Sequence, residues 1–427
     1  MPFPRERPGG SLEVAGPIDA DTEWDADTVR VTGDLSLLDG ITLSIAAGTR
    51  VEFQGHYRLD VQGRLLALGL PQAPITFTSA DPAAFAIDST LSGAWNGLRF
   101  MGTPETNGVS RLEHCIIEYA KAARDTALFG PVMLEGFSRL SVVNSIIRHN
   151  VADYGAAICC MHSSAPRLIG CLFTDNYAFK AGSVLWCVDS FPRLVNCTLA
   201  ENSDLNLQIF DPAAPVTSFL SKPQTSSSIL WGNATNYFIP AQLYEAKAFY
   251  TRDCDVEWGY PGENNIDLDP LFAGDGEHPF RLLADSPCVN AGAADTTGYD
   301  LPMLDLAGWE RVREGRVDQG AYEFHPGTPV EAPLPAELCY MDNFPNPFNP
   351  RTTIRVSPGV SGRVELAIFD VRGRRIATLL DADLDAGIHS VTWQAQDERG
   401  RPLPSGLYTA RLQSPIGSAS LKLILLT

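Results

Sequence analysis

Three ionisable side chains recur at an equal spacing and could carry out acid–base chemistry together. His149, Asp175 and Glu201 are 26 residues apart along the chain. If the segments that carry them stack as parallel strands, the carboxyl groups of Asp175 and Glu201 lie roughly 5 Å apart. That separation suits the carboxyl pair of a retaining glycosidase, and it equally suits a cation held between two carboxylates. We take these residues as catalytic candidates, with a solvated turn edge as the alternative interpretation.

A row of arginines and a group of aromatic residues are the candidate ligand-binding residues. Arg111, Arg167 and Arg193 each precede a leucine that is expected to point inward. Stacked guanidinium groups could bind an acidic polysaccharide, or they could pair with acidic side chains on the solvent face. Sugar rings stack on aromatic faces, so three aromatic residues in or beside the longer turns are further candidates: Tyr154, Tyr177 and Trp186. For these rings the alternative is packing against the turns.

The spacing of the candidates comes from a repeated sequence element. Residues 163–176 read SSAPRLIGCLFTDN, and residues 189–202 read DSFPRLVNCTLAEN. Further copies align on one small residue, which is Cys115, Ser145, Cys171, Cys197 and Ser228 in successive copies. In the last four copies an asparagine follows, at Asn150, Asn176, Asn202 and Asn233. A second recurring piece begins at a glycine, at Gly130, Gly155 and Gly182.

A period near 26 residues, with short strands and glycine at the turns, predicts an all-β fold built on a right-handed parallel β-helix. A bend near Gly170 would let one copy bury both Leu168 and Cys171, which would otherwise lie on opposite faces of a strand. The repeated asparagines would stack as an amide ladder inside one turn. We assign residues 1–29 to an N-terminal cap and residues 30–324 to the solenoid, which at this period has about ten coils.

The repeat resembles those of pectate-lyase-like β-helix proteins and of polymorphic outer-membrane proteins. Residues 173–176 read FTDN, which matches the FxxN signature of the latter group, and residues 155–158 read GAAI, which approximates its GGAI signature. Residues 264–324 contain NNIDLDPLF, ADSPCVNAG and VDQGAYEF, and they resemble the closing segment of secreted bacterial β-helix proteins. The resemblance implies an exported protein but no particular activity.

A second resemblance covers residues 338–427. NFPNPFNP, VELAIFDVRGRRIATL and LPSGLYTARL follow one another in this part of the chain. These blocks are similar to the Ig-like module shared by type IX secretion sorting domains and the flagellar hook-capping protein. Alternating apolar stretches separated by Gly, Pro and Asp turns independently predict a β-sandwich here. We therefore expect a C-terminal Ig-like module, a Pro-rich linker at 325–337, and secretion machinery as a partner of the module.

The composition excludes several kinds of partner and site. A net charge of −19 argues against nucleic acid as a partner. The chain has no apolar stretch long enough to span a membrane, and its first residues, MPFPRERPGG, do not form a signal peptide. Nine cysteines occur without the paired spacing of a zinc site, and they leave the disulfide state open. We expect no cofactor, with calcium as the exception left open.

Two functions follow from these patterns. The first is an exported bacterial protein, extracellular or on the cell surface, that we expect to be a monomer. It would bind a polysaccharide or another surface component without catalysing a reaction. A regular repeat without a converging catalytic set favours it. The alternative is a polysaccharide lyase or glycoside hydrolase acting along the solenoid face, which depends on the fold analogy and on the pair Asp175 and Glu201.

Overall fold

The computed structural model describes residues 10–102, 106–124, 127–136, 139–204, 214–235, 242–245, 249–312, 315–326, 340–344, 348–358, 360–384 and 389–426. The chain divides after Pro326 into two compact units, a solenoid and a smaller C-terminal unit. Apart from one 3-10 turn at Pro82–Ala84, every named element in these ranges is a strand. The expected linker at 325–337 lies outside the described residues from 327 onward.

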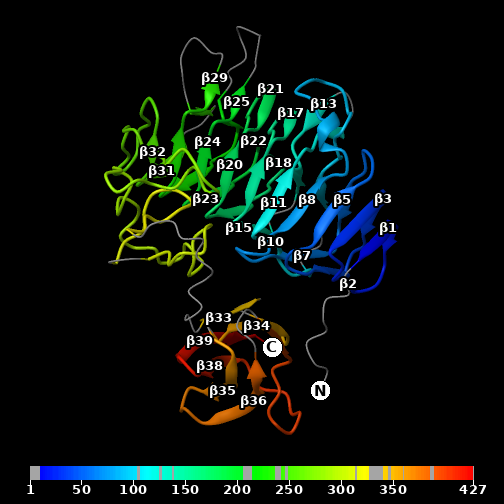
Figure 1. Cartoon of the computed structure of the whole chain (residues 1–427), viewed down its shortest axis with the longest axis vertical. Helices are drawn as coiled ribbons and strands as arrows, with labels where there is room; N and C mark the ends of the chain where they lie inside the picture. The colour runs from blue at the N-terminus through cyan, green and yellow to red at the C-terminus, as the bar shows by residue number, and fades with distance from the viewer. Residues whose placement is uncertain are drawn as a thin grey trace. The chain divides into compact units, whose positions relative to one another are not determined.

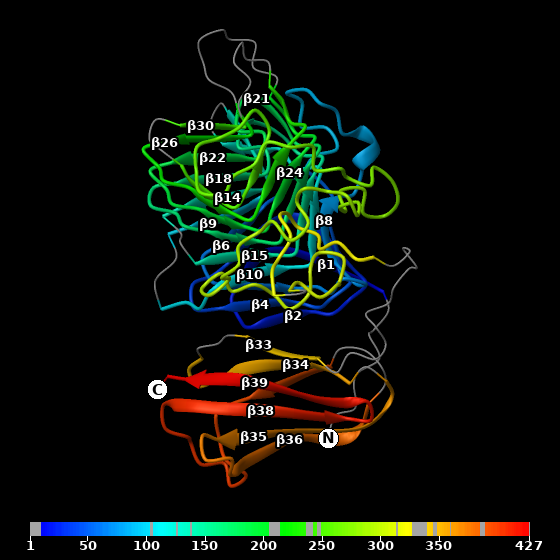
Figure 2. The same ribbon diagram turned by 90° about the vertical axis from the view of Figure 1, so that its left-hand side faces the viewer.

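One coil of the solenoid contributes a strand to each of three parallel walls. In a central coil these strands are β18, β19 and β20, and each pairs in register with its equivalent in the next coil, β22, β23 and β24 (Figures 1 and 2). A fourth strand, β21, belongs to a six-stranded sheet at the turn that leads back to the first wall. The predicted parallel β-solenoid is therefore confirmed.

Wall 1 consists of β6 (Leu59–Val61), β9 (Leu98–Met101), β14 (Val132–Glu135), β18 (Ile158–Met161), β22 (Leu185–Val188), β26 (Val216–Phe219) and β30 (Leu243–Glu245). Wall 2 consists of β2 (Thr22–Trp24), β4 (Thr42–Ile45), β7 (Arg64–Leu68), β10 (Ser110–Glu113), β15 (Leu140–Val143), β19 (Arg167–Ile169), β23 (Arg193–Val195), β27 (Gln224–Ser226) and β31 (Tyr250–Arg252).

Wall 3 consists of β1 (Ser11–Ile18), β3 (Thr28–Leu37), β5 (Arg50–Phe53), β8 (Ile75–Ser79), β11 (Cys115–Glu118), β16 (Ile146–Arg148), β20 (Leu172–Thr174), β24 (Thr198–Ala200), β28 (Ile229–Trp231) and β32 (Asp255–Val256). The six-stranded sheet consists of β12 (Ala122–Arg124), β13 (Ala127–Phe129), β17 (Val151–Tyr154), β21 (Tyr177–Ala181), β25 (Ser203–Asp204) and β29 (Ala234–Thr235).

Strand β3 joins walls 1 and 3 into one 17-stranded sheet. Its first half pairs with β5 and its second half pairs with β6. Because β1 already pairs in parallel with β3, the strand pairing begins at Ser11, ahead of residue 30 where the sequence placed the first coil. That the solenoid is right-handed remains a prediction, which follows from the right-handed crossover rule for parallel strands.

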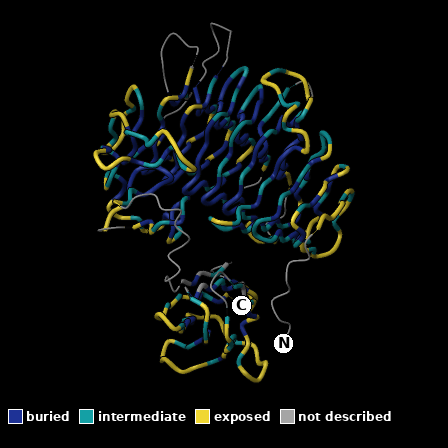
Figure 3. The backbone as a smooth tube through the Cα atoms, in the orientation of Figure 1, coloured by how far each residue is buried: buried dark blue, intermediate teal, exposed yellow. Residues whose placement is uncertain are grey.

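The interior is filled by apolar side chains that repeat from coil to coil. The residues along the walls are accordingly buried (Figure 3). The small-residue row aligned from the sequence is buried throughout, and its cysteines are free thiols. Between walls 2 and 3 the chain turns through a left-handed residue in each coil, at His114, Asn144, Gly170, Asn196, Ser227 and Asp253. The bend expected near Gly170 is thus present, with φ of 63° at that residue. We call this line of turns the 2–3 corner.

A last parallel bridge joins Ile266 to Asp255, and residues 267–326 do not continue the coils. This closing segment instead folds back over the outer faces of walls 2 and 3. Its Phe280, Leu306 and Tyr322 pack against Leu172 and Ala200 of wall 3. Further along the wall, Leu282 and Cys288 pack against Ile229. The solenoid predicted to run to residue 324 therefore ends its strand pairing near β32, and the remaining residues cover its outside.

The C-terminal unit is a sandwich of two antiparallel sheets. One sheet contains β33 (Tyr340–Phe344), β34 (Thr352–Ser357) and β37 (His389–Trp393), and the other contains β36 (Arg375–Leu384), β35 (Gly362–Asp370), β38 (Gly406–Ser414) and β39 (Gly417–Leu425). Its core includes Ile354, Leu366 and Trp393, which come from both sheets. The predicted Ig-like sandwich is confirmed.

Candidate functional site

The catalytic candidates lie on one line of turns between wall 3 and the six-stranded sheet. His149, Asp175 and Glu201 all have left-handed backbones, with φ of 55°, 52° and 59°. The amide nitrogen of Asp175 donates to the carbonyl oxygen of Glu201 at 3.3 Å, so these residues occupy adjacent coils. Tyr119 precedes them in the row, and its ring stacks on that of His149 with centroids 5.7 Å apart. The structure therefore brings the three candidates into one row.

The electrostatics of this row are modest. Partial burial raises the pKa of Glu201, and the neighbouring carboxylate of Asp175 raises it further. Burial lowers the pKa of His149, opposed by Asp175. Glu201 is exposed, and no cluster of three or more His, Cys, Asp or Glu side chains in the described ranges could hold a metal ion. The row offers an adjacent acid pair, but no ligand set that would hold calcium.

The next residue in each coil forms a buried line of amides, which we call the Asn row. Nδ2 of Asn150 donates to Oδ1 of Asn176 at 2.9 Å, and Asn176 donates to Asn202 in the same way at 2.9 Å. Asn202 donates to Asn233 at 2.8 Å, and Gln242 accepts the last hydrogen bond at 2.7 Å. Each Nδ2 also donates to backbone carbonyls, such as those of Ile147 and Thr174 at Asn176. Because all four amides are buried and bonded, this row holds the turn in place.

The arginine candidates are engaged within the protein. The register of wall 2 aligns Arg111, Ser141, Arg167 and Arg193, so a serine separates the first arginine from the other two. Arg111 pairs with Glu113 at 3.0 Å, and Arg167 pairs with Asp300 of the closing segment. Arg193 donates to the carbonyl of Gly298 at 3.1 Å and lies over the Tyr299 ring. Two of the three guanidinium groups thus hold the closing segment against wall 2.

Two of the aromatic candidates belong to a longer strip of rings, which we call the aromatic row. Tyr154 and Trp186 have ring centroids 4.6 Å apart. Phe129 lies 6.3 Å from Tyr154 on one side, and Phe219 lies 4.9 Å from Trp186 on the other. All four rings are half-buried. The third candidate, Tyr177, stands apart from this strip, in register with Val151 and Ser203 of the six-stranded sheet.

The aromatic row crosses from the six-stranded sheet to the outer face of wall 1. Phe129 and Tyr154 end β13 and β17, whereas Trp186 lies in β22 and Phe219 ends β26. Two of its rings, Phe129 and Trp186, pack against buried Met133 and Cys159. At its edge, Nζ of Lys180 lies 5.0 Å from the Tyr154 ring centre and 3.5 Å from a carboxylate oxygen of Asp153. Phe129 and Phe219 were missed from the sequence because the copies that carry them lie beside irregular insertions.

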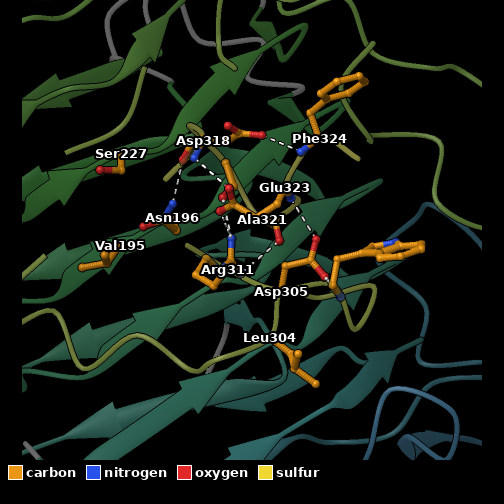
Figure 4. A network of polar contacts seen from close by, with 12 residues as sticks. Val195, Asn196, Ser227, Leu304, Asp305, Arg311, Asp318, Ala321, Glu323 and Phe324 are labelled. Atoms are coloured by element: carbon orange, nitrogen blue, oxygen red, sulfur yellow. Dashed lines mark hydrogen bonds and ion pairs between the residues drawn. The ribbon is translucent and has the colours of Figure 1, made fainter. Parts of the chain in front are cut away.

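A buried charged network occupies the 2–3 corner, and no sequence pattern pointed to it (Figure 4). Nη1 of Arg311 lies 3.2 Å from Oε1 of Glu323, and both side chains are buried. Asp305 accepts hydrogen bonds from the amides of Trp309 and Glu323 at 2.7 and 2.8 Å. Burial raises the pKa of Asp305 to about 6 and that of Glu323 to about 8, and at both groups the positive charge of Arg311 opposes this shift.

This network fastens the closing segment to the coils. Asn144 donates to the carbonyl of Leu304 at 3.0 Å. Asn196 donates to the carbonyl of Asp318 at 2.8 Å (Figure 4). At Gly170 an added Cβ would lie 2.3 Å from the Asn144 Oδ1 and 2.8 Å from the Arg311 Nη2. Glycine at this position therefore makes room for Arg311. The network is structural and presents no open reactive group.

Comparisons with known proteins identify one part of the chain. Residues 349–418 match the FlgD Ig-like domain family. No curated protein matches the chain. In the part of the chain that the structure describes, no helix is long and apolar enough to cross a membrane.

Among solved structures, partial likenesses exist to two proteins of Porphyromonas gingivalis. Latent PorU is 24% identical with a TM-score of 0.18, and 20% of this chain aligns with 9% of that one. PorZ, a surface component of the type-IX secretion system, is 20% identical with a TM-score of 0.16, and 20% of this chain aligns with 11% of PorZ. This chain thus spans about a tenth of either protein, and at these scores the likeness supports no inference.

Proposed function

We propose that this chain is an extracellular or cell-surface protein whose solenoid binds a polysaccharide without cleaving it. The aromatic row carries the proposal. Four half-buried rings from successive coils form a continuous strip, and a strip of rings with one ring per coil suits a linear polymer better than a compact ligand. Phe129 and Trp186 pack against a buried cluster, and restricting their rotamers in advance lowers the side-chain entropy lost on binding.

The surface placement is supported by the C-terminal unit. An Ig-like module that matches the FlgD Ig-like family follows the solenoid, and the sequence of that module resembles type IX sorting domains. Such a module would present the solenoid outside the cell and would be recognised by secretion machinery. Proteinase treatment of intact cells of the source organism tests this placement, because protection of the chain from proteinase would contradict it.

Alanine substitution in the aromatic row tests the binding role. Trp186→Ala combined with Tyr154→Ala is expected to weaken binding to the best neutral polysaccharide of a glycan panel at least tenfold, because central aromatic contacts dominate binding energy. Phe191→Ala is the matched control, since Phe191 is an exposed ring outside the row. Unchanged affinity in the double variant, or release of sugar products by the wild type, would count against the proposal.

A second candidate function is polysaccharide cleavage at Asp175 and Glu201. The raised pKa of Glu201 next to Asp175 is what favours it, because a retaining glycosidase needs one protonated and one ionised carboxyl. A depolymerisation screen with and without calcium would reveal the activity. If turnover is found, Asp175→Asn and Glu201→Gln must abolish it, and turnover that survives both changes would exclude this assignment.

A further inference from the structure

Charge is distributed unequally along the chain. Residues 1–339 contain 22 Lys or Arg against 43 Asp or Glu, whereas residues 340–427 contain 10 against 8. The Ig-like module is therefore slightly basic in a protein whose net charge is −19. Charge asymmetry of this kind marks a region with its own charged partner. The question is where on the module its positive charge gathers.

Two turns of the module have the same sequence pattern and the same hydrogen bonds. In the turn from Asp370 to Arg374, Oδ1 of the aspartate accepts from the amides of residues 372 and 374 at 3.0 and 2.9 Å. In the turn from Asp397 to Arg401, the equivalent amides of residues 399 and 401 donate at 2.9 and 3.0 Å. A glycine with positive φ completes each turn, Gly373 at 77° and Gly400 at 72°.

Each turn neutralises one arginine and leaves another without an acidic partner. Arg374 donates from Nε to its aspartate at 3.1 Å, and Arg401 does the same at 2.8 Å. Arg372 and Arg399, at the middle of the turns, are exposed, and their guanidinium groups make no ion pair with any described residue. The two turns thus hold two unpaired guanidinium groups at their tips.

The two turns lie side by side. The amide of Glu398 in the second turn donates to the carbonyl of Ile376, two residues after the first turn, at 3.2 Å. Beside them, the guanidinium groups of Arg375 and Arg411 lie 5.6 and 4.7 Å from the centre of the Phe369 ring, and Arg375 also pairs with Glu365. Both turns therefore contribute to one surface, which we call the arginine end of the module.

We propose that the arginine end is a second binding site, specific for an acidic polysaccharide. Guanidinium groups bind carboxylates and phosphates through paired hydrogen bonds, which suits acidic groups carried on a sugar chain. A sparsely charged polymer is favoured over nucleic acid, because DNA carries one charge per ~1.7 Å. The strongly acidic solenoid of the same molecule would repel such a dense polyanion more than a sparse one. This site is independent of the aromatic row.

The test measures binding of the full chain to polygalacturonate, with its methyl ester as the uncharged form of the same backbone. We expect the wild type to bind the acid at least tenfold more tightly than the ester, and to bind more weakly as salt rises. Arg372→Glu with Arg399→Glu should reduce binding to the acid at least tenfold. Arg363→Glu is the control for a charge reversal elsewhere on the module, because Arg363 lies at the opposite end of β35. This variant should change binding less than twofold.

Further arms separate this site from the other possibilities. Trp186→Ala must leave polygalacturonate binding unchanged, whereas a loss there would place the acidic polymer on the solenoid and overturn the proposal. The proposal also fails if the wild type binds the ester as well as the acid, or binds neither. Tighter binding to duplex DNA than to polygalacturonate would assign the arginine end to nucleic acid instead. Equal melting temperatures for all variants exclude unfolding as the cause of a loss.

Discussion

The solenoid buries polar side chains at two of its corners, and it does so by different means. The Asn row is filled from inside, by one neutral amide per coil, each bonded to the next. The 2–3 corner is filled from outside, where Arg311 and Glu323 of the closing segment enter between the coils. There, Nε of Arg311, Oδ1 of Asn196 and Oε1 of Gln319 have no hydrogen-bond partner among the described residues.

The difference shows how a repeat shapes its own chemistry. An amide carries a donor and an acceptor, so identical asparagines can satisfy one another indefinitely along the stack. A charged group cannot be stacked on copies of itself, so the corner that holds charges depends on a segment from elsewhere in the chain. We call the corner with the Asn row the neutral corner and the 2–3 corner the charged corner. We expect the stability that the neutral corner contributes to be independent of pH, and that of the charged corner to change with pH.

The largest effect should come from breaking the charged corner. Arg311→Met leaves the carboxyls of Asp305 and Glu323 buried without their cation, which typically costs 3–5 kcal/mol. Urea unfolding should show a loss of that order, together with cleavage of the closing segment by low concentrations of protease. Arg50→Met removes an ion pair with Glu52 from the same unit, in which both side chains are partly exposed, and it should cost less than about 1 kcal/mol. Equal losses in the two variants would contradict this view of the corner.

Breaking the neutral corner should cost somewhat less. Asn176→Ala removes an acceptor from Asn150 and donors to Asn202, Ile147 and Thr174, all of them buried. Leaving buried groups unsatisfied costs about 1–3 kcal/mol. The melting temperature should fall by an amount that is the same at pH 5.5 and pH 8. A melting temperature within error of the wild type would show that the Asn row contributes no stability.

Lowering the pH should stabilise the charged corner, which is the opposite of ordinary acid denaturation. At this corner burial raises the pKa of Asp305 to about 6 and that of Glu323 to about 8, and elsewhere in the solenoid it raises the pKa of Asp204 in β25 to about 7. The folded state then holds more protons than the unfolded chain between about pH 4 and pH 8, so stability falls as pH rises through this window. We expect the solenoid to be about 1–3 kcal/mol more stable at pH 5.5 than at pH 8.

Two comparisons make that prediction sharper. Glu323→Gln should remove the upper part of the pH dependence while keeping an acceptor for Arg311. The Ig-like module is an internal control, because hydrogen bonds lower the pKa of its half-buried Asp370 and Asp397. Its transition should show no gain in stability on acidification to pH 5.5. A solenoid transition that does not change with pH would mean that these carboxyls are ionised in the folded protein.

The smallest effect is expected one residue away from the Asn row. Glu201→Gln changes an exposed side chain whose backbone conformation already places it at the turn surface. Surface substitutions of this kind usually stay within about 0.5 kcal/mol. Melting curves of Glu201→Gln and Asn202→Ala should therefore differ clearly, although the two residues are neighbours. An equal fall in melting temperature for the Glu201 and Asn202 variants would contradict the distinction between the buried Asn row and its exposed neighbours.

The repeat made the solenoid predictable because each coil imposes the same requirement on Leu168, Cys171 and Asn176 as on their copies. The spacing also placed His149, Asp175 and Glu201 in one row. Contacts between distant segments carry no such period. Two such contacts pair Arg167 with Asp300 and Arg311 with Asn144. Each joins residues more than 130 positions apart, so the local sequence pattern does not predict them.

Gly170 has a consequence for how this protein can change in length. Successive coils are nearly equivalent, so a segment that packs along the stack could bind equally well after a shift by one coil in either direction. The missing side chain at Gly170 breaks that equivalence, because Arg311 fits beside it and is hydrogen-bonded to Asn144 of the preceding coil. The closing segment is thereby fixed to the coils between Asn144 and Asp253. A coil duplicated ahead of β5 would leave this registration intact, whereas one inserted after Asn144 would destroy it. The solenoid can therefore grow at one end only.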